Sequence, residues 1–240
     1  MQVFLTVDVE PDCPPYLWTW RGIEQGMPRL MEMLDRHQVP VTFFITGDTA
    51  ERYPELTASI AARGHEIGNH GYSHHSFADF DESRARSEII ETSNVLRQFA
   101  PVTSFRAPYL RLPEAFVRIL PEAGITTDAS RARYKFKEPA TPDVPGVARL
   151  AASIPTSAMR LPAAIRNPVF RRLPSPVVLF VHPWEFVDIS REKVPFDCRF
   201  RTGTAAVSAL SDVIELYRNA GAEFRYVRDW REPSPLRQRA

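Results

Sequence analysis

The sequence predicts a single α/β domain built around a mostly parallel sheet. Short apolar runs rich in β-branched and aromatic residues alternate with segments of helical period, and this order is typical of parallel α/β folds. The chain has 240 residues, of which 44% are hydrophobic, enough for one well-buried core. We therefore expect one domain over residues 1–230, followed by a loose tail over residues 231–240.

The expected elements follow each other in regular order. Asp81 is the expected N-cap of a helix over residues 82–99. Further helices are predicted over 27–38, 49–62 and 113–124, and over 207–217, where apolar residues recur at steps of three and four. Strands are predicted over 2–7, 39–47, 65–70, 103–108 and 125–130, in the apolar run that ends at His182, and over 223–227.

Residues 131–176 interrupt this order. Eight prolines fall in the segment, and proline disfavours the interior of a helix because it has no backbone N–H. Basic and apolar residues are mixed there without a clear period. We expect loops with one or two strands in this part of the chain.

Composition excludes several classes of partner. The chain carries 30 Lys and Arg against 29 Asp and Glu, so its net charge of +1 gives no field that would attract nucleic acid or an acidic membrane. The two cysteines, Cys13 and Cys198, lack CxxC spacing, which favours a reduced compartment. The amino terminus has no signal-peptide pattern, and no apolar run reaches about 18 residues. We expect a cytoplasmic protein without a nucleic-acid or membrane partner, and a homo-oligomer stays open.

Four of the six histidines lie in the stretch GHEIGNHGYSHHSF, residues 64–77. His70 and His74 are four positions apart, so on one helical turn or in a tight loop both imidazoles can face one ion. His70 and His74 lie at the end of a predicted strand and just beyond it, where functional residues of α/β folds gather. A solvated polar loop is the alternative, because HxxxH spacing alone is a weak signal. His65 and His75 are expected to serve the loop or the surface.

A second polar cluster follows the first predicted strand. Asp8, Glu10 and Asp12 alternate in the segment TVDVEPD, so their side chains point to the same side. A metal site with three protein ligands needs one carboxylate here, and a second carboxylate can take a proton from water. A turn or a helix cap is the alternative for each acid.

Two further residues stand at predicted strand ends. Arg106, in FRAPY, follows an apolar run, and a buried arginine needs an anionic partner, for which Asp8 is the candidate. His182, in LFVHPWEF, is either a structural histidine or a general acid, and the second role requires the sheet to close on itself. Trp184 either walls the substrate or packs in the core.

Taken in order, five motifs make the chain resemble the polysaccharide deacetylase family, the NodB-homology domain of carbohydrate esterase family 4. They are TVDVEPD, HGYSH, RAPY, TDAS and LFVHPW, and the similarity spans roughly residues 1–230. The resemblance implies a deformed (β/α)7 barrel and a divalent metal, usually zinc, with Co, Ni or Mn as alternatives. It also implies that water, activated by this metal, attacks an amide or ester carbonyl.

The resemblance implies a role for each catalytic residue. Asp8 is the general base, and Arg106 holds it in place. His182 is the general acid that protonates the leaving amine, with Asp128 tuning it. The backbone amide of Tyr109 helps to stabilise the oxyanion.

The resemblance also implies the metal ligands. His70 and His74 correspond to the two histidines of the second motif. The commonest first motif has two adjacent aspartates, whereas Val9 stands in the second of these places here. We assign Glu10 as the third ligand, with Asp12 as the alternative.

The expected function is removal of an acetyl group from an N-acetylated sugar or sugar conjugate. A branch of the superfamily with a first motif like this one, and with HGYSH, includes enzymes that act on small cyclic amides. Opening of a small cyclic imide or ureide is therefore an alternative. The altered acidic motif suggests a third hypothesis, a catalytically silent carbohydrate-binding barrel. The expected partner is thus a carbohydrate or a small amide.

Overall fold

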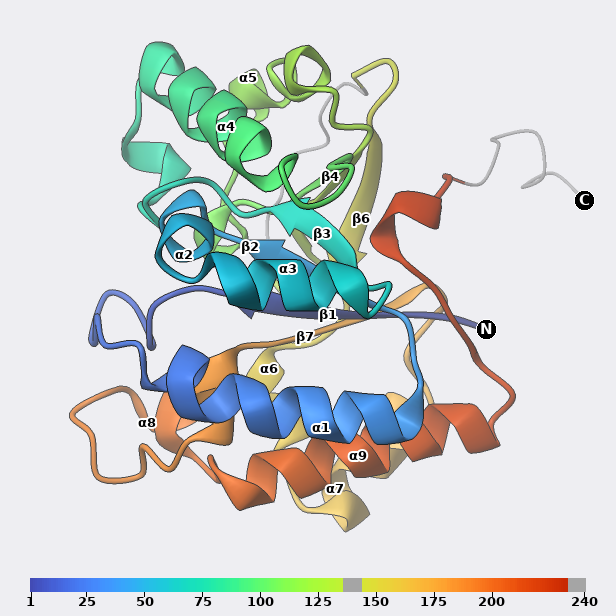
Figure 1. Cartoon of the computed structure of the whole chain (residues 1–240). Coiled ribbons are helices and arrows are strands. Elements are labelled where there is room, and N and C mark those ends of the chain that lie inside the picture. The colour runs from blue at the N-terminus through green and yellow to red at the C-terminus, as the bar shows by residue number, and fades with distance from the viewer. Residues whose placement is uncertain (136–143, 233–240) are drawn as a thin grey trace, which may run out of the picture.

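The computed structural model describes residues 1–135 and 144–232, and these residues form one α/β domain (Figure 1). All of its strand pairings are parallel. Neighbouring strands follow the order β6-β5-β4-β3-β2-β1-β7, and β8 pairs with the start of β1. The strands are β1 (Gln2–Val9), β2 (Val41–Ile45), β3 (Glu66–Asn69), β4 (Ser104–Phe105), β5 (Thr127–Ala132), β6 (Ala148–Ala152), β7 (Val177–Val181) and β8 (Glu223–Phe224).

The two ends of this strand order meet, so the sheet is a nearly closed barrel. Ser153, just after β6, donates its backbone N–H to the carbonyl of Val178 in β7 at 2.9 Å. The hydroxyl of Ser153 accepts the N–H of Val178 at the same distance of 2.9 Å. The prediction of a single-domain (β/α)7 barrel is confirmed, with seven strands in the ring that the described residues form.

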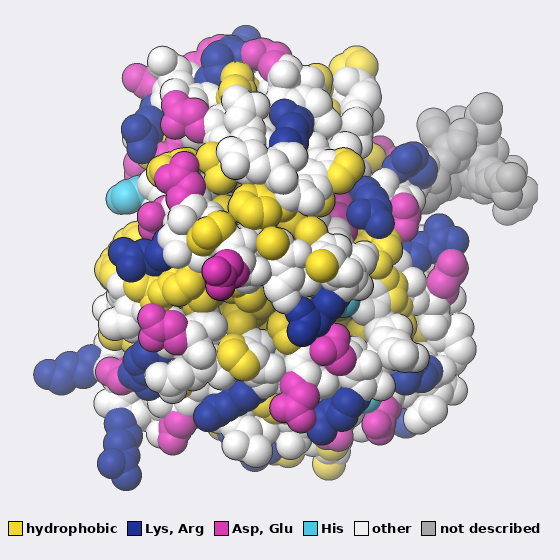
Figure 2. All heavy atoms as spheres, viewed as in Figure 1, with side chains coloured by type: hydrophobic (Ala, Val, Ile, Leu, Met, Phe, Trp, Pro, Cys, Tyr) yellow, Lys and Arg dark blue, Asp and Glu magenta, His cyan; other side chains and the backbone are white. Residues whose placement is uncertain are grey.

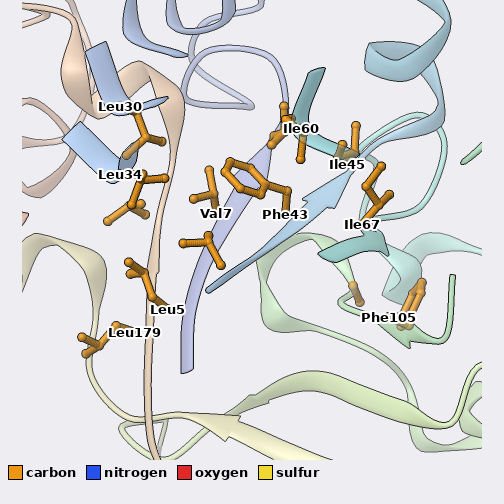
Figure 3. Packing of buried hydrophobic residues seen from close by; sticks show 14 of the residues in the cluster. Leu5, Val7, Leu30, Leu34, Phe43, Ile45, Ile60, Ile67, Phe105 and Leu179 are labelled. Carbon is orange, nitrogen blue, oxygen red and sulfur yellow. The ribbon is translucent and has the colours of Figure 1, made fainter. Parts of the chain in front are cut away.

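Side chains of β1 point alternately to the inside and to the outside of the barrel. Phe4 lies inside the barrel and meets the edge of Trp230, with ring centroids 5.9 Å apart. Leu5 and Val7 lie in the larger core between the sheet and the outer helices (Figure 3). Because strand side chains alternate, Asp8 shares the inner face with Phe4. Asp8 therefore lies inside the barrel, near the carboxyl end of β1.

Helices cover the outside of the barrel (Figure 1). The helices α1 (Met27–His37) and α9 (Thr204–Asn219) lie side by side. The helices α3 (Pro54–Ala62) and α4 (Glu82–Leu96) pack on β3. As predicted, Asp81 caps α4, and its carboxylate accepts the N–H of Arg84 at 2.8 Å.

Prolines divide two segments that were each predicted as one helix. Residues 49–62 form α2 (Gly47–Arg52) and α3, which separate at Tyr53 because Pro54 begins the second helix. Residues 113–124 form α5 (Glu114–Val117) and a 3-10 turn, η4 (Leu120–Ala123), with Pro121 in its first turn. Proline has no N–H to continue a helical hydrogen-bond ladder but fits the first turn of a new helix.

The proline-rich segment contains more helix than predicted. Besides β6, it forms α6 (Thr156–Met159) and α7 (Ala163–Phe170). Pro155 and Pro162 stand at the N-cap positions of these helices, so these two prolines mark where helices begin, whereas Pro168 lies within α7. Residues 136–143 and, in the predicted tail, residues 233–240 lie outside the described residues.

The face that carries α1 and α3 has apolar side chains across its middle, with charged side chains around them (Figure 2). A groove of about 740 Å³ lies between α1 and α3, and Met27, Met31 and Leu56 contribute to its lining. None of the predicted catalytic or metal-binding residues lines this groove. None of the described helices is both long and apolar enough to cross a membrane.

Candidate active site

The carboxyl ends of four strands bring the predicted site residues together. Asp8 and Glu10 come from the end of β1, His70 follows β3, Arg106 follows β4, and His182 follows β7. All these strands run parallel, so their carboxyl ends share one rim of the barrel, where the active sites of barrel enzymes lie. The site is therefore a direct product of the parallel topology.

Glu10, His70 and His74 form a compact group of donor atoms. The Oε2 atom of Glu10 lies 3.2 Å from Nε2 of His70 and 2.6 Å from Nε2 of His74. One donor atom from each of the three buried residues lies within 4.8 Å of the others. Two imidazole nitrogens and one carboxylate are the three-ligand set that leaves a coordination position open on zinc. The chemistry of this donor set fits a divalent cation.

The surroundings of the donor group favour cation binding. Nδ1 of His70 lies 2.7 Å from the carbonyl of Arg106, which accepts a hydrogen bond from it and leaves Nε2 with a free lone pair. Burial opposes the charge on Glu10, but the imidazoles of His74 and His182 outweigh this and hold its pKa well below the usual value. Glu10 is therefore an anionic donor in this group.

Asp12 does not belong to this group, which corrects its assignment as the alternative ligand. Its carboxylate accepts the hydroxyl of Thr19 at 2.6 Å and the N–H groups of Arg21 at 2.8 Å and Gly22 at 2.7 Å. These bonds close the loop that follows β1. Asp12 thus has the turn-capping role that was the alternative for each acid.

Hydrogen bonds to α4 support the loop between His70 and His74. Glu88 is buried, and its Oε2 atom accepts the N–H groups of Tyr72 at 2.7 Å and Ser73 at 2.9 Å. Asn69 accepts the N–H of Gly71 at 2.8 Å. His74 has a φ angle of 55°, in the left-handed region that most residues avoid. The hydrogen bonds to the loop stabilise a backbone conformation that brings His74 back to His70.

Asp8 makes the ion pair that was predicted with Arg106. The Nη1 atom of Arg106 lies 2.7 Å from Oδ1 of Asp8 and donates to the hydroxyl of Thr6 at 2.6 Å. The guanidinium is fully buried and lies 4.4 Å from the ring centroid of Phe44. The second carboxylate oxygen of Asp8, Oδ2, lies 4.0 Å from Nε2 of His182. Arg106 thus fixes the carboxylate with Oδ2 towards the site.

His182 faces two carboxylates across the site. Its Nε2 atom lies 3.8 Å from Oε1 of Glu10 and 4.0 Å from Oδ2 of Asp8, and its ring stacks on Trp184 at 4.9 Å between centroids. Burial lowers the pKa of His182, but Glu10, Glu185 and Asp8 outweigh it and raise this pKa to about 9. A cation on Glu10 would offset part of this increase. The site favours a protonated imidazole at this position.

Asp128 does not reach His182, which corrects its predicted role in tuning that residue. Its carboxylate pairs with Nε of Arg149 at 2.7 Å and accepts the hydroxyl of Ser130 at 2.5 Å. The residue in contact with Nδ1 of His182 is Glu185, at 2.9 Å. Glu185 was not predicted, although its position three residues after His182 matches the spacing of a capping box on a short helical turn.

Tyr109 and Trp184 border a pocket of about 200 Å³ at the site. Tyr109 has a φ angle of 60°, and the edge of its ring contacts His74 at 4.9 Å between centroids. The indole N–H of Trp184 donates to Oε1 of Glu10 at 3.4 Å. Both predicted substrate-binding residues therefore lie at the pocket. Asp8, Glu10, His74 and His182 line it too.

The turn that carries His182 and Trp184 rests on two glycines. They belong to a π-helical turn, η1 (Gly22–Gly26). A Cβ atom on Gly26 would lie 2.0 Å from the carbonyl oxygen of Pro183, and one on Gly22 would lie 2.5 Å from the backbone nitrogen of Trp184. Any larger residue at either position would displace the backbone next to His182.

Fold and site together define a parallel α/β barrel whose carboxyl rim carries a donor set for one cation, flanked by Asp8 and His182. The family model for polysaccharide deacetylase matches residues 2–127, more than half of the chain. The chain belongs to the polysaccharide deacetylase family.

Curated relatives match less than half of the chain. A peptidoglycan-N-acetylglucosamine deacetylase of Bacillus cereus is 36% identical over 110 residues, which cover 45% of this chain and 36% of that protein. A chitooligosaccharide deacetylase of a Bradyrhizobium species is 32% identical over 85 residues, covering 34% of this chain and 39% of that protein. The chain thus spans well under half the length of these relatives.

Solved structures match almost the whole described fold. A pseudoenzyme of carbohydrate esterase family 4 from Bacillus anthracis superimposes with a TM-score of 0.65 at 17% identity. The match covers 95% of this chain and 64% of that one. At this identity the likeness establishes the barrel fold alone.

Proposed function

We propose that the protein is a metal-dependent deacetylase that removes the acetyl group of an N-acetylated sugar. The observation that carries this proposal is the arrangement of Asp8 and His182 on either side of the Glu10, His70 and His74 donor group. Hydrolysis of an amide needs a base for water, an acid for the leaving amine and a positive centre for the oxyanion. The rim of this barrel has side chains for each.

The donor group would hold the cation through Glu10, His70 and His74. When bound, a divalent cation lowers the pKa of water from 15.7 to about 7 and draws electrons from the substrate carbonyl. Asp8 accepts the proton of the attacking water on Oδ2, since Oδ1 is occupied by Arg106. The buried guanidinium keeps the carboxylate in this orientation throughout the reaction.

His182 supplies the proton for the leaving group. The carboxylates of Glu185 and Asp8, like that of Glu10, raise the pKa of His182 and so favour the protonated imidazole, and Nε2 faces the pocket beside Asp8. The leaving nitrogen takes this proton as its bond to the acetyl carbon breaks, which gives acetate and a free amine. The backbone N–H of Tyr109 helps to stabilise the oxyanion before that bond breaks.

N-acetylhexosamine units are the proposed substrate. The two curated relatives are named for deacetylation of peptidoglycan N-acetylglucosamine and of chitooligosaccharide. The small pocket beside the donor group suits an acetyl group, and Trp184 and Tyr109 offer aromatic surfaces against which a sugar ring packs. The presence of both flanking residues and all three donors argues against the silent carbohydrate-binding hypothesis.

Acetate release tests the proposal. Protein stripped with a chelator and reloaded with Zn²⁺ is incubated with N-acetylglucosamine oligomers, and acetate and amine are measured. We expect both products in equal amounts, and only in the reloaded sample. Ring opening of a cyclic imide or ureide without acetate release from the oligomers would support the alternative hydrolase instead. Oligomer binding without any product, or no uptake of Zn²⁺, Co²⁺, Ni²⁺ or Mn²⁺, would overturn the proposal.

A further inference from the structure

A buried chain of charged groups extends from His182 away from the pocket. His182 precedes a 3-10 turn, η5 (Pro183–Phe186), that places Glu185 under its ring. The Oε1 atom of Glu185 lies 2.9 Å from Nδ1 of His182 and also accepts the backbone N–H of His182 at 3.0 Å. The hydroxyl of Thr156, at the start of α6, donates to the same oxygen at 2.5 Å.

Arg160 completes this chain behind Glu185. Its Nε atom lies 3.1 Å from Oε2 of Glu185, and both side chains are almost fully buried. The other guanidinium nitrogens donate to the backbone carbonyls of residues 197, 198 and 200 at 2.6 to 2.9 Å. The guanidinium is therefore held at several points, and it gives Glu185 a fixed positive partner in a dry environment. Without such a partner, burial of the carboxylate would be costly.

We propose that Glu185 and Arg160 position His182 for proton transfer. This inference rests on the proposed function, because it assumes that His182 is the acid. The Nδ1–H group of His182 is donated to Glu185, which turns Nε2 towards Asp8 and the pocket. Glu185 thus takes the place that the family resemblance gave to Asp128. A capping role alone would need only the bond to the backbone N–H of His182.

The proton-transfer step balances with this arrangement. The imidazolium of His182 gives its Nε2 proton to the leaving nitrogen as the C–N bond breaks, and the electron pair of that bond stays on nitrogen. His182 is then neutral and keeps its Nδ1 proton, which remains hydrogen-bonded to Glu185. Loss of the Glu185 carboxylate would leave the Nδ1–H group without its acceptor, so the ring would no longer be held in one tautomer and could rotate, which would turn Nε2 away from the leaving nitrogen.

Two substrates with different leaving groups can distinguish this positioning role of Glu185 from a general structural role. An amine leaves only when protonated, whereas 4-nitrophenolate leaves without a proton. We expect Glu185→Gln to lower kcat on N-acetylglucosamine oligomers on the order of 100-fold. The same variant should retain its rate on 4-nitrophenyl acetate and its Zn²⁺ content. Asp128→Asn is the matched control, and its ratio of amide to ester activity should equal that of the wild type.

A second measurement does not depend on activity. Nitrogen-15 NMR of the metal-free protein, labelled in histidine, reports which ring nitrogen of His182 carries the proton when the ring is neutral. We expect the Nδ1–H tautomer in the wild type and a mixture in Glu185→Gln. An unchanged tautomer, or equal losses on the amide and the ester, would overturn the positioning role. A wild type inactive on both substrates would instead reject the proposed function, while the tautomer would still decide the inference.

Discussion

At the scale of single residues, the proposed base, ligand and acid are each fixed by a partner that lies outside the pocket. Arg106 holds Asp8, the carbonyl of Arg106 holds His70, and Glu185 holds His182. Such outer contacts orient the groups that do the chemistry and are as important as the groups themselves. Substitution of one of these groups should therefore change turnover and cation binding differently from substitution of its partner.

Asp8→Asn should keep the cation and lose turnover. The amide occupies the same space but cannot accept a proton, so we expect kcat to fall by a factor on the order of 100 or more. Zn²⁺ stoichiometry, measured on the same sample, should match the wild type. Asp48→Asn, an exposed residue of α2, serves as the control and should change neither quantity. Retained turnover in Asp8→Asn would remove this residue from the mechanism.

His74→Ala should weaken cation binding because two donors remain of three. We expect the affinity for Zn²⁺, measured by competition with a chelating dye, to fall more than about 100-fold, the upper range for loss of an outer partner of a ligand. The neighbouring His75 offers a close control, since it is exposed and its Nδ1 atom contacts Ser73 at 2.9 Å. If His74→Ala and His75→Ala bind equally well, the cation site lies elsewhere.

At the scale of elements, α4 acts as the support of the histidine loop. Glu88, on the inner face of this helix, accepts two backbone N–H groups of the loop and the hydroxyl of Ser73 at 2.7 Å. Buried donors left without an acceptor destabilise the conformation that contains them. The left-handed backbone of His74 makes this loop dependent on such support.

Glu88→Gln tests this support. We expect the affinity for Zn²⁺ to fall about 10-fold, and the amide protons of Tyr72 and Ser73 to exchange faster with solvent. A neutral amide oxygen accepts these N–H groups more weakly than a carboxylate oxygen, and the NH₂ group of glutamine cannot accept the hydrogen bond from Arg84. Glu91→Gln lies on the exposed face of the same helix and should behave as the wild type. Equal exchange rates at Tyr72 and Ser73 in the two variants would contradict the role of Glu88.

The order and type of most elements could be predicted from the sequence, because buried parallel strands and amphipathic helices differ in length and period. The errors concern prolines. Pro54 and Pro121 divide predicted helices, and Pro155 and Pro162 begin helices in a segment predicted as loop and strand. Proline disfavours a helix interior, although Pro168 lies within α7, and it favours a helix start. The residues alone do not distinguish a loop from a short helix after proline.

At the scale of the whole molecule, the site depends on closure of the barrel. The motifs predicted Asp8, Glu10, His70, His74, Arg106 and His182, which the structure brings together at one rim. Glu185, and not Asp128, contacts His182, through a local turn. Thr156 and Arg160 reach Glu185 only because α6 packs against β7. No local pattern in the sequence records which helix covers which strand.

A buried carboxylate at the opposite end of the barrel, that of Glu66, should make the free energy of unfolding depend on pH. Glu66 is buried there, where its carboxylate accepts the hydroxyls of Thr42 at 2.6 Å and Ser104 at 2.5 Å and the N–H of Arg228 at 3.1 Å. Burial raises the pKa of Glu66 above its usual value, and these hydrogen bonds only partly oppose it. The folded protein therefore holds the proton of Glu66 more tightly than the unfolded chain does.

The direction of the pH effect on stability follows from the difference between the pKa of Glu66 in the folded protein and in the unfolded chain. The stability that Glu66 contributes is fully present below its unfolded pKa and is lost as the pH rises through the folded pKa. We expect the free energy of unfolding of the wild type, relative to Glu66→Gln, to decrease as the pH rises from 4 through that range. Urea unfolding of both proteins at matched pH values measures this. A constant difference, or one of opposite slope, would show that Glu66 is not the group responsible.

The two glycines of η1 limit how this catalytic machinery can be exchanged between homologues. The segment after β7 lies so close to Gly22 and Gly26 that neither position has room for a side chain. A chimaera that transplants only the stretch around His182 into a host with bulkier residues at these places would receive the acid on a shifted backbone. Grafts that carry residues 20–27 together with residues 181–187 should transfer as one unit, although about 150 positions of sequence separate the two pieces.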